Sequence, residues 1–520
     1  MNIVQDLPQT FNAADYFVDR NIREGRGGKV AVLCEDRFFT YADIQAGVNR
    51  FGHALRSLGV RMEERVALLL LDSEVYPQAF FGAIKVGAVP VCLNTLLRPK
   101  DYEYFLNDSR ARVLVVDAAL LPSIESIRKN LRFLETVVVA RGPCPAGDLA
   151  LDPLLAAQPT ALEPAPTSKD DACFWLYSSG STGDPKGTVH LQHDMVFCAK
   201  TYGEQVLRIR EEDLCFSAAK LFFAYGLGNG LYFPFAAGAT AAYLPGRPTP
   251  DAVYAAVAQH RPTLFFGVPT LYAQLLEAEG GMESVRLGVS AGEALPADIL
   301  KRWQDRFGFG IADGIGSTEM SHIFISNDPQ DIRPGSTGRV VPGYEARIVD
   351  EALRDLPAGE VGTLLVKGDS TAACYWNKHE KTKQTMLGEW LNTGDKFYRD
   401  AEGYFYYGGR TDDMLKVGGI WVSPAEVEAA VIAHPAVLEC AVIGSPDEED
   451  LIKPRAFVVL RSGFAPSPAL GKDIKDHVKK TIAHYKFPRW VEFVDSLPKT
   501  ATGKIQRYRL RQGAENADAA

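Results

Sequence analysis

The sequence predicts an α/β fold with a large N-terminal domain and a small C-terminal domain. Short apolar runs bounded by turn residues alternate with helical patterns over most of the chain, which is typical of sheets covered by helices. From about residue 340 the pattern changes to short strands, which indicates a small β-barrel-like part within the large domain. A length of 520 residues leaves room for about three to four domain-sized units.

In the large domain we expect buried strands, two amphipathic helices and a hairpin that turns at the segment Asp-Ala-Glu-Gly. The strands are predicted at 65–71, 111–117, 136–140, 262–268, 344–350 and 362–368, the helices at 41–59 and 296–308, and the hairpin at 395–409.

A boundary near 411–413 separates these elements from a self-contained unit, which divides the chain into residues 1–411 and 412–520. The first helix of this unit is expected to begin with a capping box from Ser423 to Glu426, with Pro424 at the first helical position. Strands are predicted at 439–444 and 454–460, a helix near 472–484, a final segment at 490–498 and a disordered tail at 512–520.

Composition and charge argue against several classes of protein. The formal net charge of -9 is unlike that of a dedicated nucleic-acid binder, although local lysines and backbone amides can still bind an anion. The 8 cysteines include no CxxC pair and no secretory signal is present, so we expect reduced thiols in a cytoplasmic protein. The longest apolar stretch, 232–244, is too short to span a bilayer, so no integral membrane segment is expected. The pattern does not distinguish a monomer from a homodimer.

The segment YSSGSTGDPKG, residues 177–187, is the most unusual stretch of the chain. It lies between two predicted strands, 173–177 and 187–191. A loop rich in Gly, Ser and Thr can turn its N–H groups inward as an anion-binding nest, with Lys186 as a further donor. It is not a Walker A loop, because Lys186 does not follow glycine directly. A mobile surface loop is the alternative interpretation.

This segment resembles the phosphate loop of the acyl-adenylate-forming superfamily, which includes acyl-CoA synthetases, peptide-synthetase adenylation domains and firefly-type luciferases. Five further motifs of that family follow in its order, and the resemblance covers roughly residues 30 to 510. They are SAGEALP (290–296), DGIGSTE (313–319), NTGD (392–395), GYFYYGGRTDD (403–413) and LPKTATGKIQR (497–507).

The resemblance implies an ATP site built from these motifs. The expected nucleotide-binding residues are Ser178, Ser179, Gly180, Ser181, Thr182, Gly183 and Lys186 in the phosphate loop, Ala291, Gly292, Glu293, Asp313, Gly314, Ser317 and Thr318 around the adenine, and Asp395, Arg410, Lys416, Gly418 and Gly419 on the ribose and small-domain side.

For two of the motif residues, a role outside the ATP site is also possible from the sequence. Glu319 is expected to hold Mg²⁺ against the triphosphate, since this cation takes a protein carboxylate together with phosphate oxygens; a helix-cap or surface glutamate is the alternative. Asp395 is expected to accept both ribose hydroxyls, and Arg410 to donate to the ribose or phosphate. An aspartate after Thr-Gly is otherwise a turn residue.

Lys504 is the expected catalytic residue. A carboxylate does not react with a thiol at neutral pH until attachment of AMP gives it a good leaving group. The site must therefore bring a carboxylate and the α-phosphate together, and a positive charge aimed at the transition state serves this purpose. By resemblance, Lys504 bridges the two anions; a solvated surface lysine is the alternative.

Asp412 matches the hinge about which this family rotates its small domain between half-reactions. That rotation would withdraw Lys504 and bring the segment 416–424, with Gly418 and Gly419, to the nucleotide side. The pantetheine arm of coenzyme A would then have a path to the acyl group. An ordinary β-turn is the alternative for Asp412.

Three segments, 220–230, 265–272 and 316–327, are rich in aromatic and small residues, which suits a flat, compact acid. Ordinary core packing explains the same residues. By resemblance to benzoate–CoA ligases and relatives that use hydroxy- or aminobenzoates, benzoate is the leading acid.

Phe223 stands where many relatives have histidine, so other groups must orient the substrate carboxylate. His322 is a candidate for this role; a purely structural histidine is the alternative. The expected substrate-binding residues are Phe223, Ala224, Tyr225, Gly314, His322 and Ile323. Of these, Ala224, Tyr225, Gly314 and Ile323 are weaker candidates, as is Ala291.

The sequence thus favours an ATP-dependent aryl-CoA ligase that releases AMP and pyrophosphate. The alternatives are a ligase for another small acid, an enzyme that loads a carrier protein, a luciferase-type oxygenase and a catalytically inactive nucleotide-binding regulator.

The segment around Lys504 also resembles the site at which a protein acetyltransferase silences such enzymes. Acetylation of Lys504 would remove its positive charge.

Overall fold

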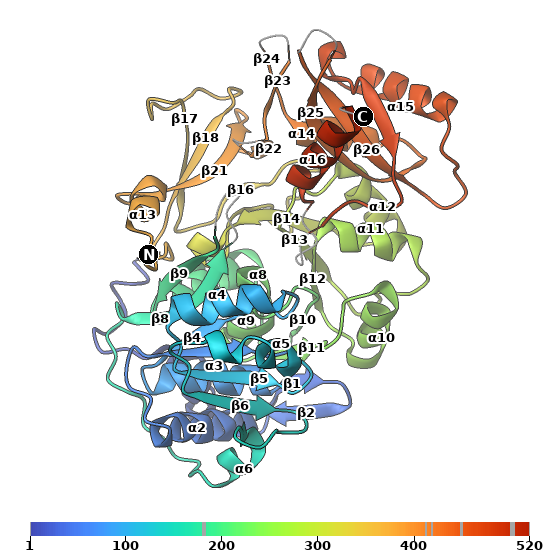
Figure 1. The fold of residues 1–520 in the computed structure, drawn as a ribbon. Helices are drawn as coiled ribbons and strands as arrows, with labels where there is room; N and C mark the ends of the chain where they lie inside the picture. The colour runs from blue at the N-terminus through green and yellow to red at the C-terminus, as the bar shows by residue number, and fades with distance from the viewer. Residues whose placement is uncertain are drawn as a thin grey trace.

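The structure is a computed structural model that describes residues 2–178, 184–410, 413–417, 420–447, 451–499 and 505–518. In Figure 1 the C-terminal elements lie together at the top, above a larger body that contains the two main sheets. The fold class predicted from the sequence is confirmed.

The first sheet has eight strands and carries the glycine-rich loop at one side. Its interior strands are parallel, while β8, β9 and β19 pair antiparallel to one another. The order is β19 (Cys374–Tyr375), β9 (Lys186–Leu191), β8 (Ala172–Ser178), β4 (Val89–Cys92), β3 (Arg65–Leu69), β5 (Val113–Asp117), β6 (Thr136–Ala140) and β7 (Leu149–Ala150).

The second sheet has nine strands and ends in the antiparallel strands that carry part of the adenine motif. Its order is β16 (Arg339–Val340), β15 (Ile323–Ser326), β14 (Ile311–Gly316), β13 (Leu287–Ser290), β12 (Leu264–Gly267), β10 (Leu214–Ser217), β11 (Thr240–Tyr243), β1 (Val30–Cys34) and β2 (Arg37–Thr40).

The largest buried core combines residues of both sheets, among them Val66 of β3 and Phe266 of β12. Helices complete it: Phe81 stacks between Phe17 and Phe235 with ring centroids 5.8 and 5.9 Å away. The two sheets therefore share one core, and their pairing fixes the loops at their edges.

The helices of the large domain match the two that were predicted and add others. The first predicted helix begins at a capping box in which Thr40 and Asp43 bond reciprocally. The α-helices are α1 (Arg20–Arg23), α2 (Tyr41–Ser57), α3 (Val75–Lys85), α4 (Pro99–Ser109), α5 (Leu121–Glu125), α6 (Leu151–Ala156), α7 (Asp194–Cys198), α8 (Ala224–Leu227), α9 (Phe233–Ala237), α10 (Pro250–His260), α11 (Pro269–Glu277), α12 (Ala297–Phe307) and α13 (His379–Thr385). The shorter helical segments are η1 (Asp15–Asp19), η2 (Arg128–Asn130), η3 (Ala199–Val206), η4 (Gly228–Tyr232) and η5 (Thr318–Met320).

The β-barrel-like part corresponds to a five-stranded antiparallel sheet. Its hairpin turns at 400–404, where Asp400 donates its N–H to the carbonyl of Tyr404 over 3.0 Å, as the sequence predicted. The sheet contains β17 (Glu345–Val349), β18 (Gly362–Lys367), β21 (Trp390–Arg399) and β20 (Met386–Leu387), with β22 (Phe405–Arg410) paired to β21.

The C-terminal unit has its own core of Val422, Val427, Val442 and neighbouring apolar residues. Ser423 caps its first helix as predicted, but the return bond of the capping box is replaced: the Glu426 carboxylate binds Lys486 Nζ at 2.6 Å. The elements are β23 (Leu415–Val417), β24 (Ile420–Val422), α14 (Pro424–Ile432), β25 (Val437–Pro446), β26 (Ile452–Leu460), α15 (Pro468–Thr481), η6 (His484–Lys486), β27 (Trp490–Phe493) and α16 (Arg507–Asp518).

The prediction of a disordered tail at 512–520 is wrong for its first part, because α16 continues to Asp518. The polar composition of the tail hid the helix, whose first turn is held by ion pairs of Arg507 and Arg511 with the small domain. Tertiary contacts thus override the weak local signal.

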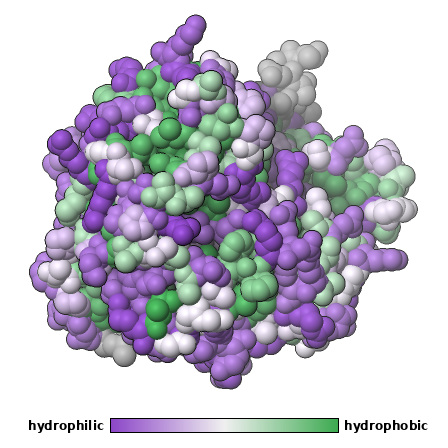
Figure 2. Space-filling view, turned by 90° about the horizontal axis from the view of Figure 1, so that it is seen from below, coloured by the Kyte–Doolittle hydropathy of each residue, from purple (hydrophilic) through white to green (hydrophobic). Residues whose placement is uncertain are grey.

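The face opposite the small domain is mostly hydrophilic, with smaller groups of hydrophobic residues between (Figure 2). Within the described ranges, none of the helices combines the length and the apolar character that a membrane crossing needs.

Candidate active site

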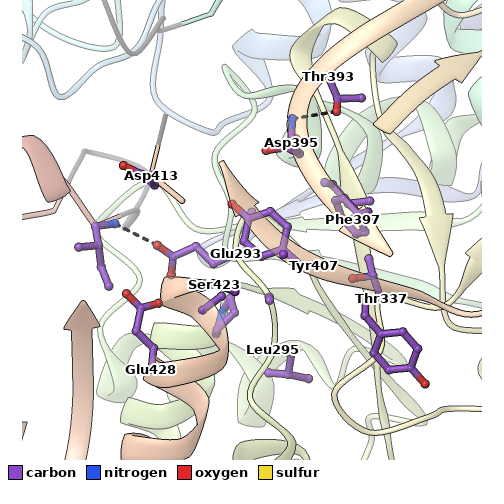
Figure 3. A pocket seen from close by; sticks show the side chains of 18 of the residues that line it. Glu293, Leu295, Thr337, Thr393, Asp395, Phe397, Tyr407, Asp413, Ser423 and Glu428 are labelled. Carbon is purple, nitrogen blue, oxygen red and sulfur yellow. Dashed lines mark hydrogen bonds between the residues drawn. The ribbon is translucent and has the colours of Figure 1, made fainter. Parts of the chain in front are cut away.

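A cavity of about 1480 Å³ lies between the two domains. The large domain lines it with Lys186, Glu319 and Asp395, and the small domain with Glu428 and Ile505. Figure 3 shows Asp395 on the strand at one side of this cavity, and Glu428 and Asp413 at the other. Motifs that are far apart in the sequence therefore meet in one place.

The glycine-rich loop joins two antiparallel strands, as predicted, since Ser178 of β8 pairs with Lys186 of β9. Both residues line the cavity, and Lys186 Nζ lies 4.5 Å from the ring centroid of Tyr375. The loop residues Ser179, Gly180, Ser181, Thr182 and Gly183 lie outside the described residues, so their predicted phosphate contacts stay predictions.

Glu319, the last residue of the motif DGIGSTE, sits in the short turn η5. Ser317 caps this turn by accepting the N–H of Met320, and the carbonyl of Thr318 lies 2.7 Å from Nε2 of the buried His190. The Glu319 carboxylate accepts the hydroxyl of Tyr375 at 2.7 Å. A bond through one oxygen leaves acceptor capacity for a hard cation, so the position fits the expected Mg²⁺.

In the described part of the chain, no group of three or more His, Cys, Asp and Glu side chains is arranged to hold a metal ion. One carboxylate together with phosphate oxygens remains the kind of site that suits Mg²⁺.

The two predicted adenine segments line the cavity. Gly292 has φ +95°, a conformation that favours glycine, and the next residue, Glu293, accepts the backbone N–H of Ile505 at 2.9 Å. This bond, drawn as a dashed line in Figure 3, joins the large domain to the small one. Burial raises the pKa of Asp313 well above its ordinary value. Asp313 pairs with Ser290 of β13, and the next residue, Ala291, is buried.

Asp395 lies on β21 with only 8% of its surface exposed. Its N–H donates to Thr393 Oγ1 at 3.1 Å, and its cross-strand partner is Arg410. Residues predicted to share the ribose are therefore neighbours in the sheet, although the Arg410 side chain lies outside the described part.

The predicted acid-binding residues lie in, or directly before, α8, β14 and β15. The Tyr225 hydroxyl donates to the carbonyl of Val289 at 2.9 Å, which is the structural role weighed against a substrate contact. A Cβ on Gly314 would lie 3.0 Å from Ile323 Cγ2, so these two residues are in close contact. Among the residues that the structure describes, the lining of the large cavity includes Gly314 but not Phe223, Ala224, Tyr225, His322 or Ile323.

His322 is buried among aromatic rings, with Phe233 at a centroid distance of 4.5 Å. Burial lowers its pKa to about 3, so the ring is neutral. Nε2 lies 3.3 Å from the carbonyl of Tyr225 and must donate to it, which leaves a lone pair on Nδ1. Its substrate role stays a prediction, and the ring brings no positive charge to it.

Lys504 lies outside the described residues, as do Asp412, Gly418, Gly419 and the side chain of Lys416. The residues that follow Lys504 are tied to the small domain. Arg507 binds the carboxylate of Glu428 through two bonds of 2.7 and 2.8 Å, and Arg511 pairs with Asp413.

Sequence reasoning missed three residues that organise the site. Tyr375 and His190 contact the turn of Glu319, and Arg507 anchors the segment after Lys504. Arg507 stands within a quoted motif, so its charge was a usable signal. Nothing local marks Tyr375 or His190 as part of the site, because their partners in the turn of Glu319 lie 56 and 128 positions away in the sequence.

Comparisons with known proteins agree with this geometry. Among curated proteins, the chain is 53% identical to a benzoate–CoA ligase of Thauera aromatica, over 97% of this chain and 96% of that protein. It is 47% identical to a 4-hydroxybenzoate–CoA/benzoate–CoA ligase of Rhodopseudomonas palustris, over 96% and 94% of the two chains.

Among solved structures, the anthranilate CoA ligase AuaEII in complex with anthranoyl-AMP matches with a TM-score of 0.97 and 48% identity, over 99% of this chain and 100% of that one. A benzoate CoA ligase from Burkholderia xenovorans matches with a TM-score of 0.89 and 47% identity, over 96% and 100%.

Family models describe both parts of the molecule. The model of the AMP-binding enzyme matches residues 18–376, and that of the AMP-binding enzyme C-terminal domain matches residues 426–504. Together with the shared cavity, these matches show that the chain belongs to the family of AMP-binding enzymes.

Proposed function

We propose that the protein is an AMP-forming aryl-CoA ligase whose acid is benzoate. The observation that carries this proposal is the interdomain cavity, where Ile505, the residue after Lys504, bonds to Glu293 of the adenine segment. The identity of 53% to a benzoate–CoA ligase, over nearly the whole chain, supports the choice of acid.

In the first half-reaction, a carboxylate oxygen of the acid attacks the α-phosphorus of ATP. A bond forms between them, the bond to pyrophosphate breaks, and pyrophosphate leaves. Lys504 would offset the repulsion between the two anions, while Lys186 and the amides of its loop hold the phosphates. Asp395 would accept the ribose hydroxyls. Glu319 would hold Mg²⁺, which supplies charge neutralisation on the phosphate oxygens when bound.

In the second half-reaction, the thiolate of coenzyme A attacks the acyl carbon. The carbon–sulfur bond forms, the carbon–oxygen bond to AMP breaks, and AMP leaves with the electron pair. The division at 1–411 and 412–520, with the hinge at Asp412, would let the small domain carry Lys504 away first. The segment of Lys416, Gly418 and Gly419 would then face the nucleotide.

ATP–pyrophosphate exchange tests the first step. Exchange that depends on benzoate, followed by formation of benzoyl-CoA only when coenzyme A is added, is the expected result. Exchange with benzoate but without any transfer to coenzyme A would point to a carrier protein as acceptor. Absence of exchange with every aromatic acid would contradict the proposal.

A ligase for amino- or hydroxybenzoates is the second candidate, because the structure of an anthranilate CoA ligase matches with a TM-score of 0.97. A panel of benzoate, hydroxybenzoates, aminobenzoates, cinnamate and hexanoate separates the two. We expect the highest kcat/KM with benzoate; a higher value for anthranilate would favour the second candidate.

Acetylation of Lys504 by a protein acetyltransferase is proposed as a means of control, since it would remove the charge that joins the two anions. Stoichiometric acetylation at this residue should abolish adenylation. Full activity of such a sample would rule this control out.

A further inference from the structure

Tyr375 is held at the cavity by its backbone. As part of β19 it pairs with Thr188 of β9, two residues after Lys186. Its N–H donates to Thr382 Oγ1 at 3.0 Å, and only 3% of the residue is exposed. Strand pairing therefore fixes the position of the Tyr375 backbone, independently of the contacts that its side chain makes.

The side chain of Tyr375 touches two charged residues of the site at once. Its hydroxyl donates to Glu319 Oε1 at 2.7 Å, and its ring centroid lies 4.5 Å from Lys186 Nζ. Lys186 is the first residue of β9 in the eight-stranded sheet, whereas Glu319 lies between β14 and β15 of the nine-stranded sheet. One aromatic residue thus connects the two sheets at the phosphate end of the cavity.

Both contacts restrict a flexible side chain without neutralising it. A carboxylate that accepts one O–H keeps lone pairs for a cation. An ammonium over an aromatic face keeps N–H donors for phosphate oxygens. Fixing both side chains beforehand lowers the ordering cost when the charged ligand binds.

We propose that Tyr375 is a positioning residue: its hydroxyl orients Glu319 toward Mg²⁺, and its ring orients Lys186 toward the phosphates of ATP. This inference rests on the proposed function, because it deepens the roles of Glu319 and Lys186. It assigns the two effects to different parts of one side chain, which makes them separable.

Two variants separate these parts. Tyr375→Phe keeps the ring and removes the hydroxyl, while Tyr375→Leu removes both. Tyr254→Phe is the matched control, since its buried hydroxyl donates to the carbonyl of Leu275 at 2.6 Å, outside the cavity. Glu319→Gln serves as the reference for loss of the metal ligand.

The experiment is calorimetric titration of each full-length variant with ATP, once with Mg²⁺ and once with EDTA. For Tyr375→Phe we expect ATP affinity in EDTA within about twofold of wild type and a loss of about tenfold with Mg²⁺, the scale of one hydrogen bond to a charged group. For Tyr375→Leu we expect a further loss of about threefold or more in both conditions, because Lys186 loses the ring. In pyrophosphate exchange, excess Mg²⁺ should restore the rate of Tyr375→Phe.

The outcomes distinguish this inference from the proposed function. If Glu319→Gln loses the effect of Mg²⁺ on ATP affinity but both Tyr375 variants match the Tyr254→Phe control, the role of Tyr375 is overturned and the metal site stands. If Mg²⁺ leaves the ATP affinity of the wild type unchanged, the metal assignment and this inference both fail. Benzoate-dependent exchange would still test the ligase function in that case.

Discussion

The large domain fixes its side of the cavity by strand pairing and buried hydrogen bonds, whereas the small domain reaches it through polar contacts at its edge. Glu319 is held by Tyr375, and its neighbour Thr318 by His190, a residue with no exposed surface. Across the cavity, Ile505 donates one N–H to Glu293. The binding groups of the large domain are thus held in place, while the side with Lys504, the proposed catalytic residue, is joined by contacts that can break.

A second polar contact between the domains lies at the cavity beside Asp298. Arg461, after β26, pairs with Glu277 at the end of α11 and lies 3.9 Å from Asp298 of α12. Arg302 shares both carboxylates, at 2.6 and 3.8 Å. Such a contact between charged side chains suits the proposed movement of the small domain between half-reactions.

Within the small domain, by contrast, the segment that follows Lys504 is firmly attached. Arg507 is paired with Glu428, and this carboxylate also accepts the N–H of Val442 at 2.8 Å. The nearby carboxylates raise the pKa of Arg507 despite its burial, so the guanidinium stays charged. The lysine segment should therefore move with its domain as one body.

The largest expected effect is that of Lys504→Ala. Adenylation, measured as pyrophosphate exchange, should fall by about 10² to 10³, the scale of one preorganised donor. Transfer from preformed acyl-AMP to coenzyme A should fall far less. Wild-type rates in both half-reactions would show that the charge of Lys504 is not used.

Asp412→Pro should separate the half-reactions in a different way. Proline restricts the backbone at the proposed hinge, so the domain can reach one arrangement and not the other. One half-reaction should stay within about twofold while the other falls by tenfold or more, as single-turnover rates would show. Equal loss of both would argue against a hinge.

The titration of His322 tests whether its ring is shielded from water in the large domain. Its pKa is lowered to about 3 by burial, against about 6.5 in an unfolded chain. Its contribution to stability is therefore present above about pH 6.5 and is lost as the pH falls toward 3. Between these values, the unfolding free energy of wild type should fall by up to about 1.4 kcal/mol per pH unit more than that of His322→Gln. Denaturant unfolding at pH 7, 6 and 5 measures this; parallel slopes would mean that His322 titrates normally.

The smallest expected effect is that of Arg461→Ala, since a partly exposed ion pair contributes about 0.2 to 1 kcal/mol. Adenylation should fall by about two- to fivefold, more at low salt than at high salt. Arg354→Ala, whose exposed pair with Asp350 lies within the large domain, is the control. If Arg461→Ala lost no more adenylation activity than this control, Arg461 would not contribute to the contact between the domains that adenylation uses.

Local patterns were sufficient for much of the fold. The strands at 65–71 and 136–140 and the helix at 41–59 were predictable, because each has its own apolar periodicity and turn signals. Helix α16 was not predictable, since the ion pairs at its start are made with residues distant in the sequence.

In the site, too, some residues could be predicted from local patterns and others could not. Lys186, Glu319 and Asp395 were found because glycine-rich motifs surround them, and the cavity brings them together. Tyr375 stands in no such motif, and its importance comes from a strand pairing that periodicity does not reveal. The lone pair of His322 likewise depends on a backbone carbonyl of a different segment.

The most direct measurement is a crystal structure of the protein with ATP and benzoate bound. We expect an adenylate in the interdomain cavity, its phosphate beside Lys186, its ribose on Asp395, and Lys504 between the carboxyl group and the α-phosphorus. A nucleotide bound elsewhere, with the cavity between Glu293 and Asp395 filled only by water, would contradict the proposed enzyme.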